Sequence, residues 1–214
     1  MNATLSISNP LPAILEHPFS GAGRRRTISG FDLTVADVDR FNELLIGLGR
    51  EEPPLARDQL ASAARELCDR SIHAVAPPCI RQRMRRIAAA RRMLGDPRWT
   101  PVNGAVDTAK RVVDYARGHD DLIPDWLPRV GRLDDAIVVE TAWPQLALEI
   151  DDYLDFCRLR EAQAQRYGRS VAGFGFNRDD WEQARYEEAV LAAQQRHVRE
   201  ASYLPVAAPQ FRIH

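Results

Sequence analysis

The residues best suited to chemistry in this 214-residue chain gather in its middle, between positions 119 and 135. The stretch reads HDDLIPDWLPRVGRLDD, and its carboxylates are dense enough to suggest a hard cation such as Mg²⁺ or Ca²⁺. Paired carboxylates can also share a proton and act as acid and base. The candidate metal ligands are His119, Asp121, Asp125, Asp134 and Asp135. However, the chain has neither an HExxH motif nor an EF-hand loop.

Helix capping explains the same carboxylates without a reaction, and we prefer this interpretation. Asp121 precedes a short turn in which Pro124 costs no hydrogen bond. Asp134 is placed to cap the following helix, and Asp135 falls in its first turn, where the helix dipole favours a negative charge. The apolar residues expected to form a plug between the two helix starts are Leu122, Ile123, Trp126, Leu127 and Leu133. We therefore expect no catalytic residue and no cofactor. The alternative is a carboxylate site that binds Mg or Ca and supports hydrolysis.

The central stretch also carries a distinctive motif, in which a tyrosine is followed by DLIPD, a proline, a glycine and LDD. Its residues are Tyr115, Leu122, Ile123, Pro124, Pro128, Gly131 and Leu133. Over about residues 110–143 the chain resembles the YkvA-like family of small bacterial proteins, although GHD stands where the family usually has Ser-Pro-Ile. The resemblance implies a helical core over about residues 104–168 and no established activity. It also implies peripheral contact with the inner membrane.

Helices are the elements that must position this motif, because apolar residues recur at helical spacing through most of the chain. Thr34 and Asp37 mark the start of the first helix, and Asn177 and Asp180 mark the start of the last. Pro144 should kink or split the long helix that follows the motif. The expected helical segments are 35–48, 55–75, 78–94, 103–117, 134–167 and 181–201.

These patterns predict an all-α fold of about seven helices with a central helical hairpin. The helical domain is expected to cover residues 34–201. Residues 1–33, rich in Pro, Ser and Gly, are expected to be an extended or partly ordered arm, and residues 202–214, with two prolines, an extended tail. We find no convincing strand alternation.

The composition is that of a globular protein, with 45% hydrophobic residues, 28% charged residues and a net charge of -1. It excludes a disordered chain and a disulfide scaffold. Three widely spaced cysteines, the lack of a signal segment and the lack of a long apolar run lead us to expect a cytoplasmic protein.

The small net charge hides two opposed segments. Residues 79–100 hold seven arginines against one aspartate, a net charge of +6, and residues 118–152 carry a net charge of -7. Docking of one segment on the other is the preferred interpretation, because arginine pairs well with carboxylates. The alternatives are a solvated face and an anion-binding face made by Arg81, Arg85, Arg86 and Arg92. Such a face would favour anionic lipid over nucleic acid, since no helix-turn-helix pattern is present.

Signatures of catalysis are missing elsewhere, because the chain has no phosphate-binding glycine loop and no GxSxG elbow. The last helix is rich in alanine, which permits close approach of another helix. We therefore expect a non-catalytic helical interaction or adaptor protein that binds an unknown protein or a second copy of itself.

Overall fold

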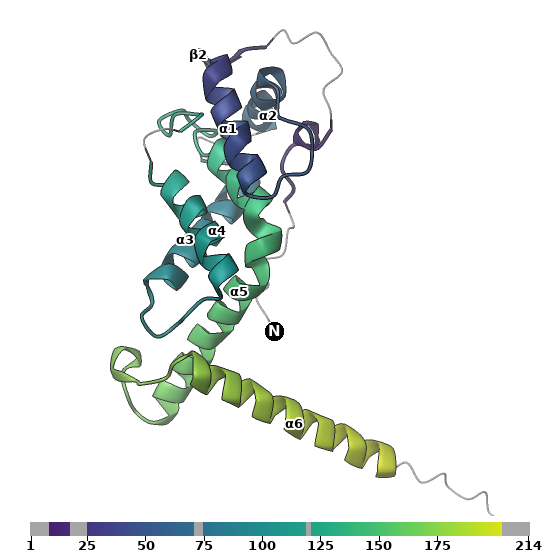
Figure 1. The fold of residues 1–214 in the computed structure, drawn as a ribbon, viewed down its shortest axis with the longest axis vertical. Coiled ribbons are helices and arrows are strands. Elements are labelled where there is room, and N and C mark those ends of the chain that lie inside the picture. Colours follow the sequence, from purple (N-terminus) through teal and green to yellow (C-terminus); the bar gives the residue numbers. More distant parts are fainter. Residues whose placement is uncertain (1–8, 18–24, 71–74, 119–120, 203–214) are drawn as a thin grey trace, which may run out of the picture. The chain divides into compact units, whose positions relative to one another are not determined.

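The structure, a computed structural model, describes residues 9–17, 25–70, 75–118 and 121–202. Within these residues it confirms the all-α class, with six α-helices and one small two-stranded sheet (Figure 1). The helices are α1 (Val35–Gly47), α2 (Arg57–Arg70), α3 (Pro78–Gly95), α4 (Asn103–Tyr115), α5 (Leu133–Arg166) and α6 (Arg178–Ser202). Two short 3-10 helices, η1 (Ala13–Leu15) and η2 (Val171–Gly173), complete the helical elements of the described residues.

The described part of the N-terminal arm contains two short elements that the sequence did not predict. Strand β1 (Thr27–Ile28) pairs antiparallel with β2 (Phe31–Asp32) in a hairpin, and η1 precedes it. Leu15, Ile28 and Leu33 are buried, so apolar side chains hold the described part of this arm against the protein. Strands of two residues are too short to show alternation, which is why the sequence did not reveal them. Residues 1–8 and 18–24 lie outside the described residues.

Capping side chains start the first and last helices, as predicted. The Thr34 hydroxyl accepts a hydrogen bond from the Asp37 backbone N–H at 3.1 Å. At α6, Asn177 Oδ1 accepts from the Asp180 N–H at 3.1 Å, and Asp180 Oδ2 accepts from the Asn177 N–H at 2.9 Å. This reciprocal pair satisfies two backbone donors that the helix start would otherwise leave without partners.

Helix α5 is the longest element, with 34 residues, and it carries the second half of the central motif. It runs through Pro144 without the split that the sequence led us to expect. Pro144 is exposed to solvent, so water can hydrate the carbonyl that loses its helical partner there. In contrast, four consecutive residues, Ala136 to Val139, are all buried. A helix buried on every side lies in the middle of its domain, which places the start of α5 in the core.

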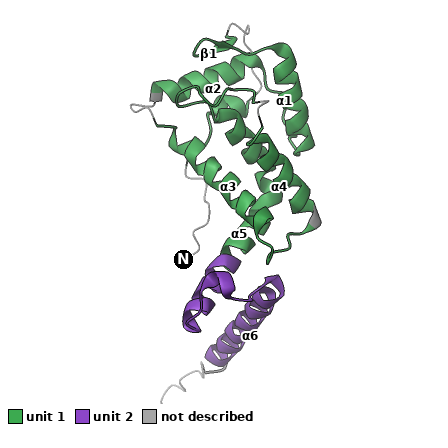
Figure 2. Cartoon of the chain, turned by 90° about the vertical axis from the view of Figure 1, so that its left-hand side faces the viewer, with its two compact units in different colours: residues 1–155 green, residues 156–214 purple. Residues whose placement is uncertain are grey.

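The chain forms two compact units, coloured separately in Figure 2. Unit 1 covers residues 1–155 and contains the central motif and the arginine-rich helix. Unit 2 covers residues 156–214 and contains the end of α5, η2 and α6. Its connection before α6 is held by stacked aromatic rings, since Phe176 stacks on Phe156 at 5.8 Å and on Phe174 at 6.1 Å between ring centroids. The tail expected from residue 202 lies outside the described residues, except for Ser202 at the end of α6.

Candidate functional site

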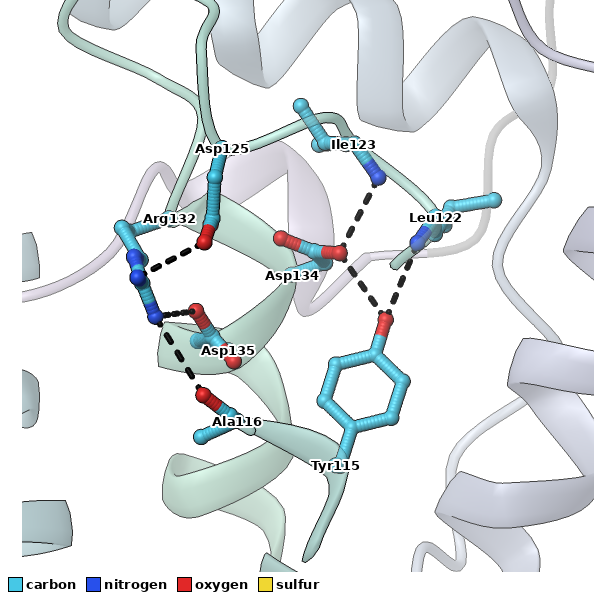
Figure 3. Close-up of polar contacts among 8 residues, drawn as sticks. All are labelled: Tyr115, Ala116, Leu122, Ile123, Asp125, Arg132, Asp134 and Asp135. Carbon is cyan, nitrogen blue, oxygen red and sulfur yellow. Dashed lines mark hydrogen bonds and ion pairs between the residues drawn. The ribbon is translucent and has the colours of Figure 1, made fainter. Parts of the chain in front are cut away.

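The loop between α4 and α5 is tied to both helices by one hydrogen-bond network (Figure 3). The Tyr115 hydroxyl at the end of α4 donates to Asp134 Oδ2 at 2.8 Å. The same hydroxyl accepts from the Leu122 N–H at 3.2 Å, and Asp134 Oδ2 accepts from the Ile123 N–H at 3.0 Å. Two side chains therefore hold the backbone at the centre of the DLIPD sequence.

Asp134 does not cap α5 in the way the sequence indicated. The helix begins at Leu133, and the Ala136 N–H already donates to the Arg132 carbonyl at 3.1 Å. Asp134 therefore lies inside the first turn, and its carboxylate reaches across to the loop instead of standing at the N-cap. The sequence did not predict this cross-connection because the acceptor and its two donors are separated by 19 and 11 residues.

Arg132 forms ion pairs with two further aspartates of the motif, Asp125 and Asp135. Its guanidinium lies 2.7 Å from Asp125 and 3.2 Å from Asp135, and it also donates to the Ala116 carbonyl at 3.4 Å (Figure 3). Asp125 and Arg132 are both about half exposed, whereas the Asp135 side chain is buried. One arginine of the same chain thus balances part of the charge of the two carboxylates.

The described residues of the motif do not converge on a metal centre. Asp134 turns toward Tyr115 and Ile123, while Asp125 and Asp135 turn toward Arg132 (Figure 3). No group of three or more histidine, cysteine, aspartate or glutamate side chains in the described part of the chain is arranged to hold a metal. His119, the nitrogen ligand suggested by the sequence, lies outside the described residues.

Burial makes the two helix-start carboxyls unusually basic. Asp134 is 1% exposed, and this desolvation raises its pKa to about 7 against the stabilising hydrogen bond from Ile123. Desolvation also raises the pKa of Asp135 to about 6, although the Arg132 charge opposes the shift. In each carboxyl group the Oδ1 atom is buried and has no hydrogen-bond partner in the described residues. These groups can hold a proton near neutral pH, and neither is exposed to a substrate.

The apolar residues of the motif divide into two groups. Leu122, Ile123, Leu127 and Leu133 are buried, as expected for a plug between the helix starts. Trp126 is not part of the plug, because it is 73% exposed. Gly131 is needed for close approach, since a Cβ there would lie 2.6 Å from the Asp125 carbonyl oxygen. Pro124 and Pro128 lie in the loop itself.

Two arginines of the arginine-rich helix α3 lie buried inside unit 1. Arg83 and Arg86 are 1% and 0% exposed, and both reach Glu140 on α5. Arg83 places Nη2 3.0 Å from Glu140 Oε1 and Nε 3.1 Å from Oε2, and Arg86 Nη1 lies 2.7 Å from Oε2. The Arg86 guanidinium also lies 3.9 Å from the centre of the Trp143 ring, and burial lowers its pKa.

Burial removes Arg86 from the anion-binding face suggested by the sequence. Arg81, Arg85 and Arg92 do stand exposed on α3. Glu140 did not stand out in the sequence as the partner of two arginines. A signal was present, because Arg83 and Arg86 lie three or four positions from buried residues such as Cys79, Ile87 and Ala90.

A second feature of the motif is a hollow of about 410 Å³ beside Tyr115. Asp121 and Leu122 line it from the loop, and Asp37 and Arg40 line it from α1. Arg40 pairs with Asp37 at 2.5 Å, so the hollow carries mixed and partly neutralised charge. Its charged lining residues are two aspartates and one arginine.

Comparison of the chain with protein-family models, with curated proteins and with solved structures gives no match. Among the described residues, no helix combines the length and the apolar character needed to cross a bilayer.

Proposed function

We propose that the protein is a non-catalytic helical interaction module that pairs with a second copy of itself through α6. The exposed apolar residues of α6 carry this proposal. Tyr186 and Val190 are 66% and 39% exposed, and Ala189 and Ala193 complete a face with the spacing i, i+3, i+4 and i+7. Alanines between two larger side chains allow another helix to approach closely, which suits a helix-to-helix contact.

The charges of α6 favour a second copy as the partner. Residues 178–188 carry five acidic and two basic side chains, whereas residues 189–202 carry two arginines and one glutamate. An antiparallel pair would place the acidic half of each helix beside the basic half of the other. Closed twofold pairing of this kind is the commonest form of homo-oligomer.

Sedimentation analysis of the full chain tests the proposal. We expect dimers with a dissociation constant below about 100 μM. Val190→Glu should weaken dimerisation at least about tenfold, because it buries a carboxylate in the apolar face. Gln195→Glu adds the same charge on the opposite side of α6 and should leave dimerisation unchanged. A wild-type chain that stays monomeric at this concentration, or two variants with equal effects, would contradict the proposal.

A second candidate function rests on the outer face of α3. Arg81, Arg85 and Arg92 follow the spacing i, i+4 and i+11, which aligns them on one side of the helix, and all three are exposed. Three aligned cations match the headgroups of an anionic membrane, each contributing about 1 kcal/mol near the surface. In this proposal the protein attaches to the membrane from the cytoplasm.

Vesicle sedimentation tests this second function. Wild-type protein should pellet with phosphatidylglycerol vesicles and not with phosphatidylcholine vesicles. The triple variant R81Q/R85Q/R92Q should remain in the supernatant, since Arg83 and Arg86 are buried and cannot replace the lost charges. Arg40→Gln on α1 serves as the control for loss of one exposed arginine. Equal pelleting with both lipids, or retention by the triple variant, would refute membrane attachment.

The YkvA-like assignment is likewise our proposal. Its support is that the separate parts of the motif meet in one network, in which Tyr115 and the first aspartate of LDD hold the DLIPD backbone. The proposed cytoplasmic location is supported by the three cysteines, none of which forms a disulfide within the described residues.

A further inference from the structure

A hollow of about 400 Å³ lies between the β-hairpin and the second half of α2. Its volume falls within the range of pockets that hold small molecules. It lies apart from the central motif in the sequence, and neither α6 nor the exposed face of α3 contributes to its lining.

Three arginines line this hollow, and none of its lining residues is acidic. Arg25 and Arg26 come from the chain leading into β1, and Arg65 comes from α2. Arg65 Nε lies 3.7 Å from Asp69, but both side chains are more than 60% exposed, so this pair is weak and easily exchanged. Unlike the hollow beside Tyr115, this one offers mainly positive charge to a ligand.

The backbone that carries two of these arginines is held in place. The Arg25 N–H donates to Asp58 Oδ1 at 2.6 Å, and the Arg25 guanidinium donates to Ser62 Oγ at 3.0 Å. The Arg26 carbonyl accepts from the Leu33 N–H at 2.9 Å, which continues the hairpin pairing by one residue. Anchored backbone lowers the conformational entropy that the arginines lose when a ligand binds.

The remaining wall of the hollow is apolar and built from small residues. Ile28, Ala61 and Ala64 are all buried and line the hollow. The alanines leave room that larger side chains would fill. A ligand suited to this site therefore has an anionic group for the arginines and a compact organic part for the apolar wall.

We propose that this hollow binds a small organic phosphate. The guanidinium groups of Arg25, Arg26 and Arg65 bind the phosphate oxygens, and Ile28, Ala61 and Ala64 contact the organic part. Guanidinium groups suit this task because their planar N–H donors match two phosphate oxygens at once. The site is independent of dimerisation through α6, so the two proposals can fail separately.

Calorimetric titration of the full chain tests the site with defined probes. Glycerol 3-phosphate and adenosine 5′-monophosphate should bind with dissociation constants below about 1 mM. Glycerol and adenosine, which lack the phosphate, should not bind. Arg26→Gln and Arg65→Gln should each weaken binding about tenfold, since each removes a charge-assisted hydrogen bond. Arg91→Gln, an exposed arginine of α3, is the matched control and should bind as wild type does.

A filling variant separates a shaped pocket from general attraction to positive charge. Ala64→Met keeps all three arginines but occupies the hollow, so it should abolish binding of adenosine 5′-monophosphate. Circular dichroism checks that each variant stays folded. The proposal is overturned if neither phosphate binds the wild-type chain at about 10 mM, roughly tenfold above the highest expected dissociation constant. It is also overturned if Arg26→Gln and Arg65→Gln both bind as wild type does.

Discussion

Replacing Glu140 with alanine is expected to lower the free energy of unfolding by about 3–5 kcal/mol. Glu140 is the carboxylate that both Arg83 and Arg86 contact, and these arginines are 1% and 0% exposed. Without it, two buried guanidinium groups lose the carboxylate that balances their charge, and among the described residues Arg83 keeps only its hydrogen bonds to the Asn9 and Cys79 carbonyls. Urea denaturation followed by circular dichroism measures the loss.

An exposed ion pair provides the control for this experiment. Asp69 lies 3.7 Å from Arg65, and both side chains are largely in solvent. Asp69→Ala should therefore cost less than about 1 kcal/mol. Glu140→Gln should fall between the two alanine variants, because its amide oxygen can still accept one arginine hydrogen bond. If Glu140→Ala costs no more than Asp69→Ala, the buried pairing does not stabilise the fold.

The stability of the protein is expected to fall as the pH rises from 4 to 8. The pKa of Asp134 is about 7 in the folded protein and about 3.8 without burial, so folding takes up a proton between these values. The folded protein favours the neutral form of such a buried carboxyl group. At higher pH the group is charged, and burying that charge lowers the free energy of unfolding. Asp134 alone should reduce the free energy of unfolding by about 4 kcal/mol across this range. Asp135, with a pKa raised to about 6, changes stability in the same direction.

Asparagine at position 134 should remove the Asp134 part of this dependence and leave the smaller part that Asp135 contributes. Asp134→Asn stays neutral at every pH and keeps an oxygen that can accept from the Ile123 N–H and the Tyr115 hydroxyl. Asp39 on α1 is exposed, so Asp39→Asn should keep the wild-type slope. The measurement is the urea midpoint at pH 5, 6, 7 and 8 for all three proteins. A flat or rising wild-type profile, or an unchanged slope in Asp134→Asn, would show that Asp134 does not control it.

Several elements could be predicted because the interactions that form them are local. The caps at Thr34 and Asn177 join residues only three positions apart, so the sequence displays both partners together. Pro78 at the first position of α3 follows from the fixed backbone of proline. The β-hairpin escaped prediction because its strands hold two residues each.

The sequence by itself determined the helical class, the capped starts of α1 and α6 and the opposition between a basic and an acidic segment. Tertiary structure alone decided which of these charges meet. Arg86 and Glu140 are 54 residues apart, and Asp134 reaches Tyr115 across 19. Spacing along a helix shows which side chains share a face, but which face is covered depends on elements distant in the sequence. For that reason Arg86 is buried, Arg85 is exposed, and Trp126 lies in solvent instead of in the plug.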